Sequence, residues 1–178
     1  QECFKELIDS YQSMVLNTCN SFVHNKDDAH DITQEVFIEV YSSIHSYKQK
    51  AKLSTWIYRI AVNKSLNFIR DNKKRNIFRS IENFFSKDYY SELQISDNID
   101  LYKNDDVDNE RIELLHNTIN SLSRNQKIAF TLHKFEKLSY KQLAEVMELS
   151  LSAIESLIHR ANKNVQKNVL KFYDKKIR

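Results

Sequence analysis

The stretch LSYKQLAEVMELSLSAIESLIHRA, residues 138–161, contains two amphipathic helical patterns separated by a short break at residues 148–150. The apolar positions that the two patterns would share recur at helical spacing: Leu143, Val146, Ile154 and Ile158. Small Ala144 would let the two helices approach closely. The pattern is typical of a helix-turn-helix, whose second helix enters the major groove of DNA, although short helical pairs in a three-helix bundle can imitate it.

The outward face of the second helix carries side chains that can contact DNA. With the apolar stripe facing inward, six residues fall on the opposite face: Ser152, Glu155, Ser156, His159, Arg160 and Lys163. Ser, His and Arg can hydrogen-bond base edges, and Arg160 and Lys163 can also reach phosphates. Glu155 places a negative charge toward DNA, where it either accepts a bond from a cytosine amine or weakens binding.

Apolar residues also recur every three or four positions farther upstream, which predicts three more helices. The first spans residues 4–22, and the third ends near Arg70. The expected N-caps are Asp27 or Asp28 for the second helix and Ser54 or Thr55 for the third. The inner face of the second helix is expected to hold Ile32, Val36, Phe37, Val40, Tyr41 and Ile44. After a polar stretch, the helical rhythm returns at Arg111.

The 178 residues include no Gly and no Pro. Their absence excludes the glycine-rich phosphate loops of dinucleotide-binding and P-loop proteins, and also the Asn-Gly and Asp-Gly hairpin turns. Codon usage in an AT-rich genome explains much of this absence, so the all-α fold class rests mainly on the apolar periodicity.

Two cysteines, Cys3 and Cys19, are too few for a disulfide framework or a metal cluster, and we expect both to pack as small apolar residues. The sequence shows no signal peptide and no apolar run approaching the roughly 18 residues that a membrane span needs. We therefore expect a cytoplasmic chain without membrane insertion.

Charge alternates in blocks along the chain. Residues 27–45 carry −5, residues 48–79 carry +9, residues 80–110 carry −7 and residues 111–178 carry +7. Two basic blocks separated by an acidic one indicate two nucleic-acid-facing modules, and the simplest alternative is a set of solvated charged faces.

We predict two small helical domains on this basis, residues 1–75 and residues 110–178. An acidic linker at residues 76–109 would join them, mostly extended over residues 86–108.

Residues 54–64, STWIYRIAVNK, mix aromatic rings with cations and amides. Rings can hold unstacked bases while cations hold the backbone, as strand separation requires. For Trp56 alone, a place in the core is the simpler interpretation. Residues 27–40, in contrast, carry acids and no base, which suits a protein-docking surface better than a DNA contact.

Three segments, in the same order and at the same separation along the chain, resemble the extracytoplasmic-function (group IV) sigma factors of bacterial RNA polymerase. Residues 31–37 (DITQEVF) are similar to the clamp-binding helix of that family, and residues 56–63 (WIYRIAVN) to its melting helix. Residues 138–161 are similar to its promoter-reading helix-turn-helix. The resemblance covers residues 2–75, a region 2-like domain, and residues 110–172, a region 4-like domain.

The resemblance implies a sigma factor, which directs core polymerase to specific promoters, assists DNA opening and is not an enzyme. It assigns the β′ clamp contact to Asp31, Gln34 and Glu35. It assigns minus-ten recognition and melting to Tyr47, Lys48, Trp56, Arg59, Asn63, Lys64, Asn67 and Arg70, with the loop at residues 47–52 and Asn63 holding a flipped base. The minus-thirty-five element would be read by Ser152, Glu155, Ser156, His159, Arg160 and Lys163.

The partners that the resemblance implies are the polymerase clamp and flap, promoter DNA, and an anti-sigma factor or other regulatory protein, with no cofactor and no metal. Four positions depart from the family pattern. Gln49, Lys50 and Glu148 stand where relatives often carry Gly, and Ser123 stands where they often carry Pro. Glu148 is therefore expected at a positive φ that disfavours residues other than Gly.

Two other functions fit parts of the sequence. A free-standing helix-turn-helix regulator would need a dimerising helix or a ligand domain, and it would leave the acidic surface of residues 27–45 without a purpose. A sigma factor with weak upstream reading, recruited by a separate DNA-targeting partner such as an RNA-guided one, is motivated by Glu155. Catalysis has little support, because the six histidines show neither metal-ligand spacing nor a neighbouring nucleophile.

Overall fold

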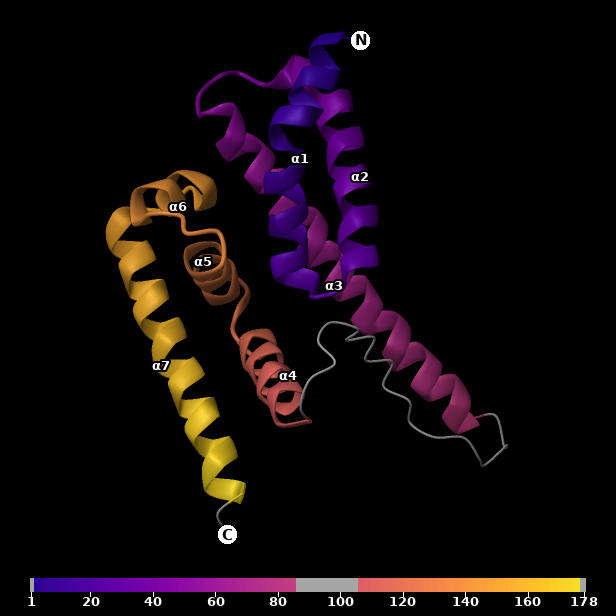
Figure 1. Cartoon of the computed structure of the whole chain (residues 1–178), viewed down its shortest axis with the longest axis vertical. Helices are drawn as coiled ribbons and strands as arrows, with labels where there is room; N and C mark the ends of the chain where they lie inside the picture. The colour runs from indigo at the N-terminus through magenta and orange to yellow at the C-terminus, as the bar shows by residue number, and fades with distance from the viewer. Residues whose placement is uncertain (1, 86–105, 177–178) are drawn as a thin grey trace. The chain divides into compact units, whose positions relative to one another are not determined.

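The computed structural model describes residues 2–85 and 106–176, and every regular element in these two ranges is helical (Figure 1). The elements are α1 (Glu2–Val23), α2 (Lys26–Ser43), the 3-10 turn η1 (Ile44–Ser46), α3 (Leu53–Phe85), α4 (Asp106–Asn120), α5 (Arg124–Lys134), α6 (Tyr140–Met147) and α7 (Leu151–Lys176). The predicted all-α class is confirmed. Contacts divide the chain into a first unit, drawn from residues 1–46 and 60–99, and a second unit, drawn from residues 47–59 and 100–178.

In the first unit, α1 and α2 pack side by side in opposite directions (Figure 1). Their facing positions are fully or almost fully buried: Val15, Cys19, Phe22, Ala29, Ile32, Val36 and Val40. This spacing of three, four and seven residues is the apolar stripe of a surface helix. Cys19 packs as expected, whereas Cys3 is exposed, so the prediction for Cys3 is wrong.

The N-cap of α2 is Asn25, and not Asp27 or Asp28 as expected. The Asn25 side-chain oxygen accepts a hydrogen bond from the backbone N–H of Asp28 at 3.0 Å. Both aspartates lie inside the first turn, where a carboxylate is favoured by the positive end of the helix dipole.

Helix α3 runs without a break from Leu53 to Phe85, so the predicted end near Arg70 is wrong. The apolar stripe fades beyond Arg70, but the chain offers no Pro or Gly there to end the helix. Because α3 begins at Leu53, Ser54 and Thr55 lie within its first turn and do not precede it. Residues up to Arg59 group with the second unit, and residues from Ile60 group with the first.

The predicted linker at residues 76–109 overlaps helices at both ends. Residues 76–85 belong to α3 and residues 106–109 to α4. The rest of the segment expected to be extended lies outside the described residues.

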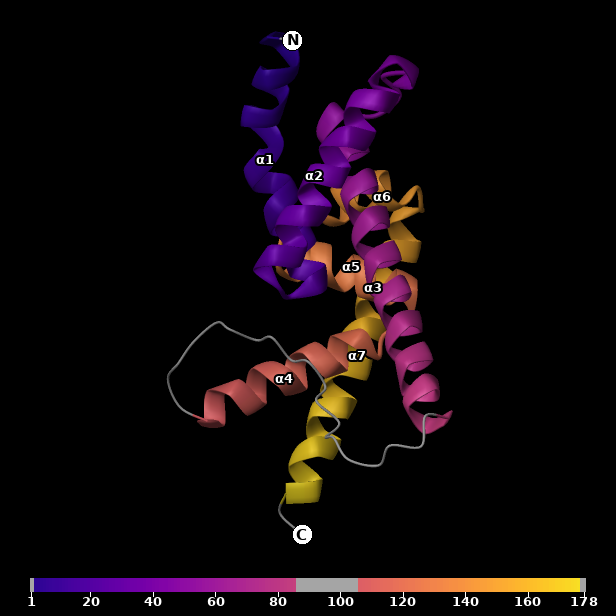
Figure 2. The same ribbon diagram turned by 90° about the vertical axis from the view of Figure 1, so that its right-hand side faces the viewer.

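The second unit contains the predicted helix-turn-helix, formed by α6 and α7. Its four shared apolar positions are all buried: Leu143, Val146, Ile154 and Ile158. Helix α4 lies against α7 (Figure 2), and a second cluster there joins Ile119 and Leu122 with Phe130 of α5 and Ala161 of α7.

The caps of α6 fix the geometry of the turn. Ser139, the N-cap, and Gln142 form a reciprocal capping box at its N-terminus. At the other end Glu148 adopts the left-handed conformation, with φ 55°, which confirms the positive φ expected there. Gln49, also at a position where relatives often carry Gly, has φ 54°. Ser123 is the N-cap of α5 and makes no side-chain capping bond.

Candidate protein-docking and nucleic-acid interfaces

One face of α2 presents acids and amides to solvent. Asp31, Gln34 and Glu35 are all exposed because they lie opposite the buried stripe of that helix. The acids also gather near the start of α2, where burial, and then the carboxylates of Asp31 and Asp27, raise the pKa of Asp28 above its ordinary value.

Two apolar side chains continue this face by one and two helical turns. Ile38 is 66% exposed and Tyr41 is 64% exposed. The Tyr41 ring packs edge-on against Phe4 of α1, with ring centroids 4.9 Å apart. The inward orientation expected for Tyr41 is therefore wrong, and Ile38 was not among the residues predicted to form a site.

We name Asp31, Gln34, Glu35, Ile38 and Tyr41 the α2 outer face. The sequence contains a signal for it, because Ile38 lies seven residues after Asp31 and Tyr41 seven after Gln34. Protein interfaces combine an apolar centre with a polar rim, and the α2 outer face offers side chains of both kinds.

The residues predicted for the minus-ten element divide between the two units. In the first unit, Asn63, Asn67 and Arg70 are exposed at a spacing that places them on one face of α3. Arg70 donates a hydrogen bond to the neighbouring Asp71 at 2.9 Å, and this bond lowers the pKa of the Asp71 carboxyl. These side chains share a solvent-facing stripe suited to a polar ligand.

Lys64 connects this part of α3 with α2. Its Nζ lies 3.7 Å from Glu35 and 3.8 Å from Glu39. A residue predicted to contact DNA therefore lies beside a residue predicted to contact polymerase.

In the second unit, Tyr47 and Trp56 form the base of the loop that precedes α3. Their ring centroids are 5.3 Å apart with an interplanar angle of 34°, and both rings are half-buried. The Tyr47 hydroxyl donates to the carbonyl of Ala51 and closes the loop on itself, while Lys48 stays exposed. One ring face of such a pair can remain open to a stacked base.

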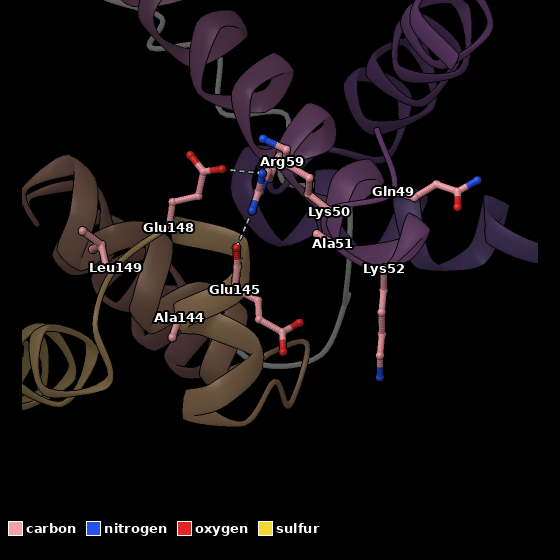
Figure 3. Close-up of a pocket in the computed structure, with 9 residues that line it drawn as sticks. All are labelled: Gln49, Lys50, Ala51, Lys52, Arg59, Ala144, Glu145, Glu148 and Leu149. Carbon is pink, nitrogen blue, oxygen red and sulfur yellow. Dashed lines mark hydrogen bonds and ion pairs between the residues drawn. The ribbon is translucent and has the colours of Figure 1, made fainter. Parts of the chain in front are cut away.

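Arg59, at the end of the same segment, points to the turn after α6 (Figure 3). It donates hydrogen bonds to the backbone of Glu145 and Val146 and pairs with the Glu148 carboxylate. No sequence signal indicated this contact, because the paired residues, 59 and 148, lie 89 positions apart in the chain.

The outward face of α7 is as predicted. All six of its residues are exposed: Ser152, Glu155, Ser156, His159, Arg160 and Lys163. A shallow hollow of about 400 Å³ lies between Glu155, Ser156, His159 and Arg160. The Arg160 guanidinium donates to the Ser156 carbonyl at 3.1 Å and lies along the helix. The helix-turn-helix thus presents an accessible polar surface of the kind that reads a groove.

Among the described residues, no group of three or more His, Cys, Asp or Glu side chains is placed to hold a metal ion. Within the same part of the chain, no helix has the length and apolar character that crossing a membrane requires.

Two family models match the chain. Sigma-70 region 2 matches residues 7–75, and Sigma-70 region 4 matches residues 112–165. The ECF RNA polymerase sigma-E factor of Haemophilus influenzae is 30% identical over 169 residues, which cover 95% of this chain and 88% of that protein. The RNA polymerase sigma-H factor of Pseudomonas aeruginosa is 29% identical over 172 residues, covering 94% and 86%.

Solved structures share the fold. CnrH in complex with the cytosolic domain of CnrY aligns with a TM-score of 0.62 at 18% identity, covering 95% of this chain and 88% of that one. The sigma factor RpoE of Bartonella quintana, in complex with the anti-sigma factor NepR, aligns with a TM-score of 0.62 at 20% identity, covering 95% and 98%.

Proposed function

The chain belongs to the extracytoplasmic-function sigma factors of bacterial RNA polymerase, and on that premise we propose which of its surfaces bind polymerase and which bind the promoter. As a sigma factor it directs core polymerase to promoters and takes part in transcription initiation. The observation that carries the assignment is the presence of two chemically different exposed surfaces, the acidic and apolar α2 outer face and the polar face of α7.

We propose that residues 1–75 act as a region 2-like domain and residues 110–178 as a region 4-like domain, with residues 76–109 between them. The α2 outer face is the site that binds the polymerase clamp. Its acids favour a basic partner, and Ile38 and Tyr41 supply the apolar area that anchors an interface.

The minus-ten element is bound by side chains of α3 and of the loop before it. Trp56, held against Tyr47, supports unstacked bases, and Asn63, Asn67 and Arg70 follow the strand along α3. Lys48 and Lys64 provide charge for the backbone. In this proposal the aromatic rings stack on bases, and the cationic side chains contact phosphates.

The minus-thirty-five element is read by the outward face of α7. Arg160 and His159 can reach base edges or phosphates, and Glu155 accepts from a cytosine amine. Glu155 then favours cytosine at one position of the promoter and does not only repel DNA.

A regulatory protein is the third proposed partner. CnrH and the Bartonella quintana sigma factor were each solved with another protein bound, CnrY and the anti-sigma factor NepR respectively. We propose that an anti-sigma factor holds this chain as well, that the chain works in the cytoplasm where polymerase acts, and that it performs no catalysis itself.

Gel filtration of the chain with core RNA polymerase tests the proposed docking site. The parent chain should elute with polymerase, and the triple variant Asp31→Asn, Gln34→Ala, Glu35→Gln should elute separately. A matched control, Glu6→Gln with Asp9→Asn, removes two exposed acids from α1 and should behave like the parent. Equal losses in the triple variant and the control would overturn the assignment of the α2 outer face.

A further inference from the structure

The last turn of α6 is held by an arginine from a distant part of the chain. Arg59 Nε donates to the carbonyl of Val146 at 3.1 Å, and Arg59 Nη2 donates to that of Glu145 at 2.6 Å. Arg59 Nη1 lies 2.6 Å from the Glu148 carboxylate. Three separate guanidinium nitrogens are thus engaged at one helix end. Figure 3 shows the contacts with Glu145 and Glu148.

These contacts provide hydrogen bonds to backbone carbonyls that have no partner within the helix. The last four carbonyls of an α-helix have no partner inside it. In α6, the backbone N–H groups of Glu148 and Leu149 both donate to the carbonyl of Ala144. The left-handed cap therefore provides no hydrogen-bond donor for the next two carbonyls, those of Glu145 and Val146. Arg59 donates to those two, and its positive charge lies at the negative end of the helix dipole.

Glu148 contributes what the usual residue at this position cannot. A left-handed C-cap favours Gly, which has no Cβ and adopts φ 55° without strain. Gly also has no carboxylate, and here the carboxylate pairs with Arg59. Glu148 therefore adopts a less favourable backbone conformation than Gly would, but it gains an ion pair with a residue outside the helix-turn-helix.

The same contact withdraws Arg59 from DNA. Arg59 is one of the residues proposed to bind the minus-ten element, and a guanidinium that faces α6 cannot face a phosphate. The pair borders a cavity of about 700 Å³ with Lys50, Lys52 and Arg59 on one wall and Glu145 and Glu148 on the other. Acids thus stand opposite a basic wall that resembles a site for a polyanion.

We propose that Arg59 and Glu148 form a latch that keeps the free chain from engaging promoter DNA, and that promoter phosphates open it by competing for Arg59. This regulation rests on the function proposed above. The side chain of Glu148 is 71% exposed and that of Arg59 is 28% exposed, so a competing anion can reach the pair. The latch is weak enough to open because exposed ion pairs contribute little stability and are screened by salt.

Variants at Glu148 test the latch without changing the DNA-binding residues. Glu148→Gly and Glu148→Asn both tolerate the left-handed conformation and lack the carboxylate. Glu145→Gln is the matched control, since it removes an equal charge three residues earlier while its backbone carbonyl still accepts from Arg59.

The first readout is hydrogen exchange of the Arg59 Nε–H in the full-length chain, measured by NMR without polymerase or DNA. Exchange should be slow in the parent and in Glu145→Gln, and faster in both Glu148 variants. Equally fast exchange in the parent would overturn the latch and would leave the proposed function unaffected.

The second readout is the affinity of each free variant for promoter DNA, measured by fluorescence anisotropy without polymerase. Both Glu148 variants should bind promoter DNA roughly two- to fivefold more tightly than the parent, in line with the small free energy of an exposed ion pair. Affinities equal to that of Glu145→Gln would overturn the inhibitory role. If even the parent failed to bind core polymerase, the proposed function would fall, which the gel-filtration result reports separately.

Discussion

The Nζ atom of Lys64 on α3 lies 3.7 Å from a carboxylate oxygen of Glu35 on α2. Both side chains are partly exposed, so the pair contributes at most about 1 kcal/mol to folding. Lys64→Gln should therefore change the free energy of unfolding by less than about 1 kcal/mol, measured by urea denaturation. The same substitution should lower the salt dependence of promoter binding by roughly one phosphate contact. An unchanged salt slope would show that Lys64 serves only the α2–α3 contact.

Trp56 is half-buried against Tyr47, and we propose that the open part of its ring faces DNA. Trp56→Ala should slow promoter opening about tenfold, since stacking of a base contributes ~1–3 kcal/mol, while closed-complex binding changes little. Permanganate reactivity of unpaired thymines measures opening, and a mobility shift measures binding. Trp56→Phe keeps a ring and should retain most of the activity. Equal losses of opening and binding would instead make Trp56 a core residue.

Tyr41 is largely exposed at the far end of the α2 outer face. Tyr41→Ala should weaken the affinity for core polymerase about tenfold, because exposed aromatic side chains often anchor interfaces. The free energy of unfolding should change little, apart from the lost ring contact with Phe4. Ser42→Ala, at the next position of α2, is the control, and fluorescence anisotropy with labelled chain gives both affinities. A Tyr41→Ala affinity equal to that of the control would remove Tyr41 from the interface.

The helix-turn-helix and its outward face could be predicted from the sequence because each depends on local spacing. Leu143 and Ile154 repeat an apolar period, and a period fixes which side of a helix is buried. The end of α3 could not be predicted in this way. A helix without Pro or Gly can continue through polar residues. Helix α3 ends at Phe85, a position that the apolar periodicity does not indicate.

Tyr41 was misassigned for a related reason. A tyrosine in an apolar stripe is usually buried, but its ring can also pack sideways on a neighbour, here Phe4, and remain exposed. The contact between Arg59 and Glu148 had no local signal at all, because it depends on tertiary structure. Only the positive φ of Glu148 could be anticipated, from the Gly that relatives often carry at this position.

Lys127 on α5 is 5% exposed, and its Nζ donates to the Asn120 side chain at 2.5 Å. Burial lowers the pKa of Lys127 from its ordinary 10.5 to about 8. Between these two values the unfolded chain binds more protons than the folded one, so the free energy of unfolding should rise as pH increases through this window. Below it, the buried charge destabilises the fold.

Lys127→Met keeps a long, unbranched side chain and removes its charge. The substitution should raise the free energy of unfolding at pH 7 by up to about 3 kcal/mol and abolish the contribution of Lys127 to the rise above pH 8. Tyr58, whose pKa is raised by burial, titrates in both proteins. Its contribution therefore cancels when the free energies of unfolding of the parent and the variant are subtracted. Lys134→Met changes an exposed lysine of the same helix and should leave the pH dependence unchanged. A parental pH dependence in Lys127→Met would contradict the burial of a titrating amine.

We propose that this chain selects promoters for core polymerase through two separate surfaces. The most direct measurement is transcription of genomic DNA by core polymerase with and without the chain, followed by sequencing of transcript 5′ ends. New start sites that depend on the chain and share two upstream elements are predicted, with Trp56→Ala reducing initiation at all of them. Start sites identical with and without the chain would contradict the account.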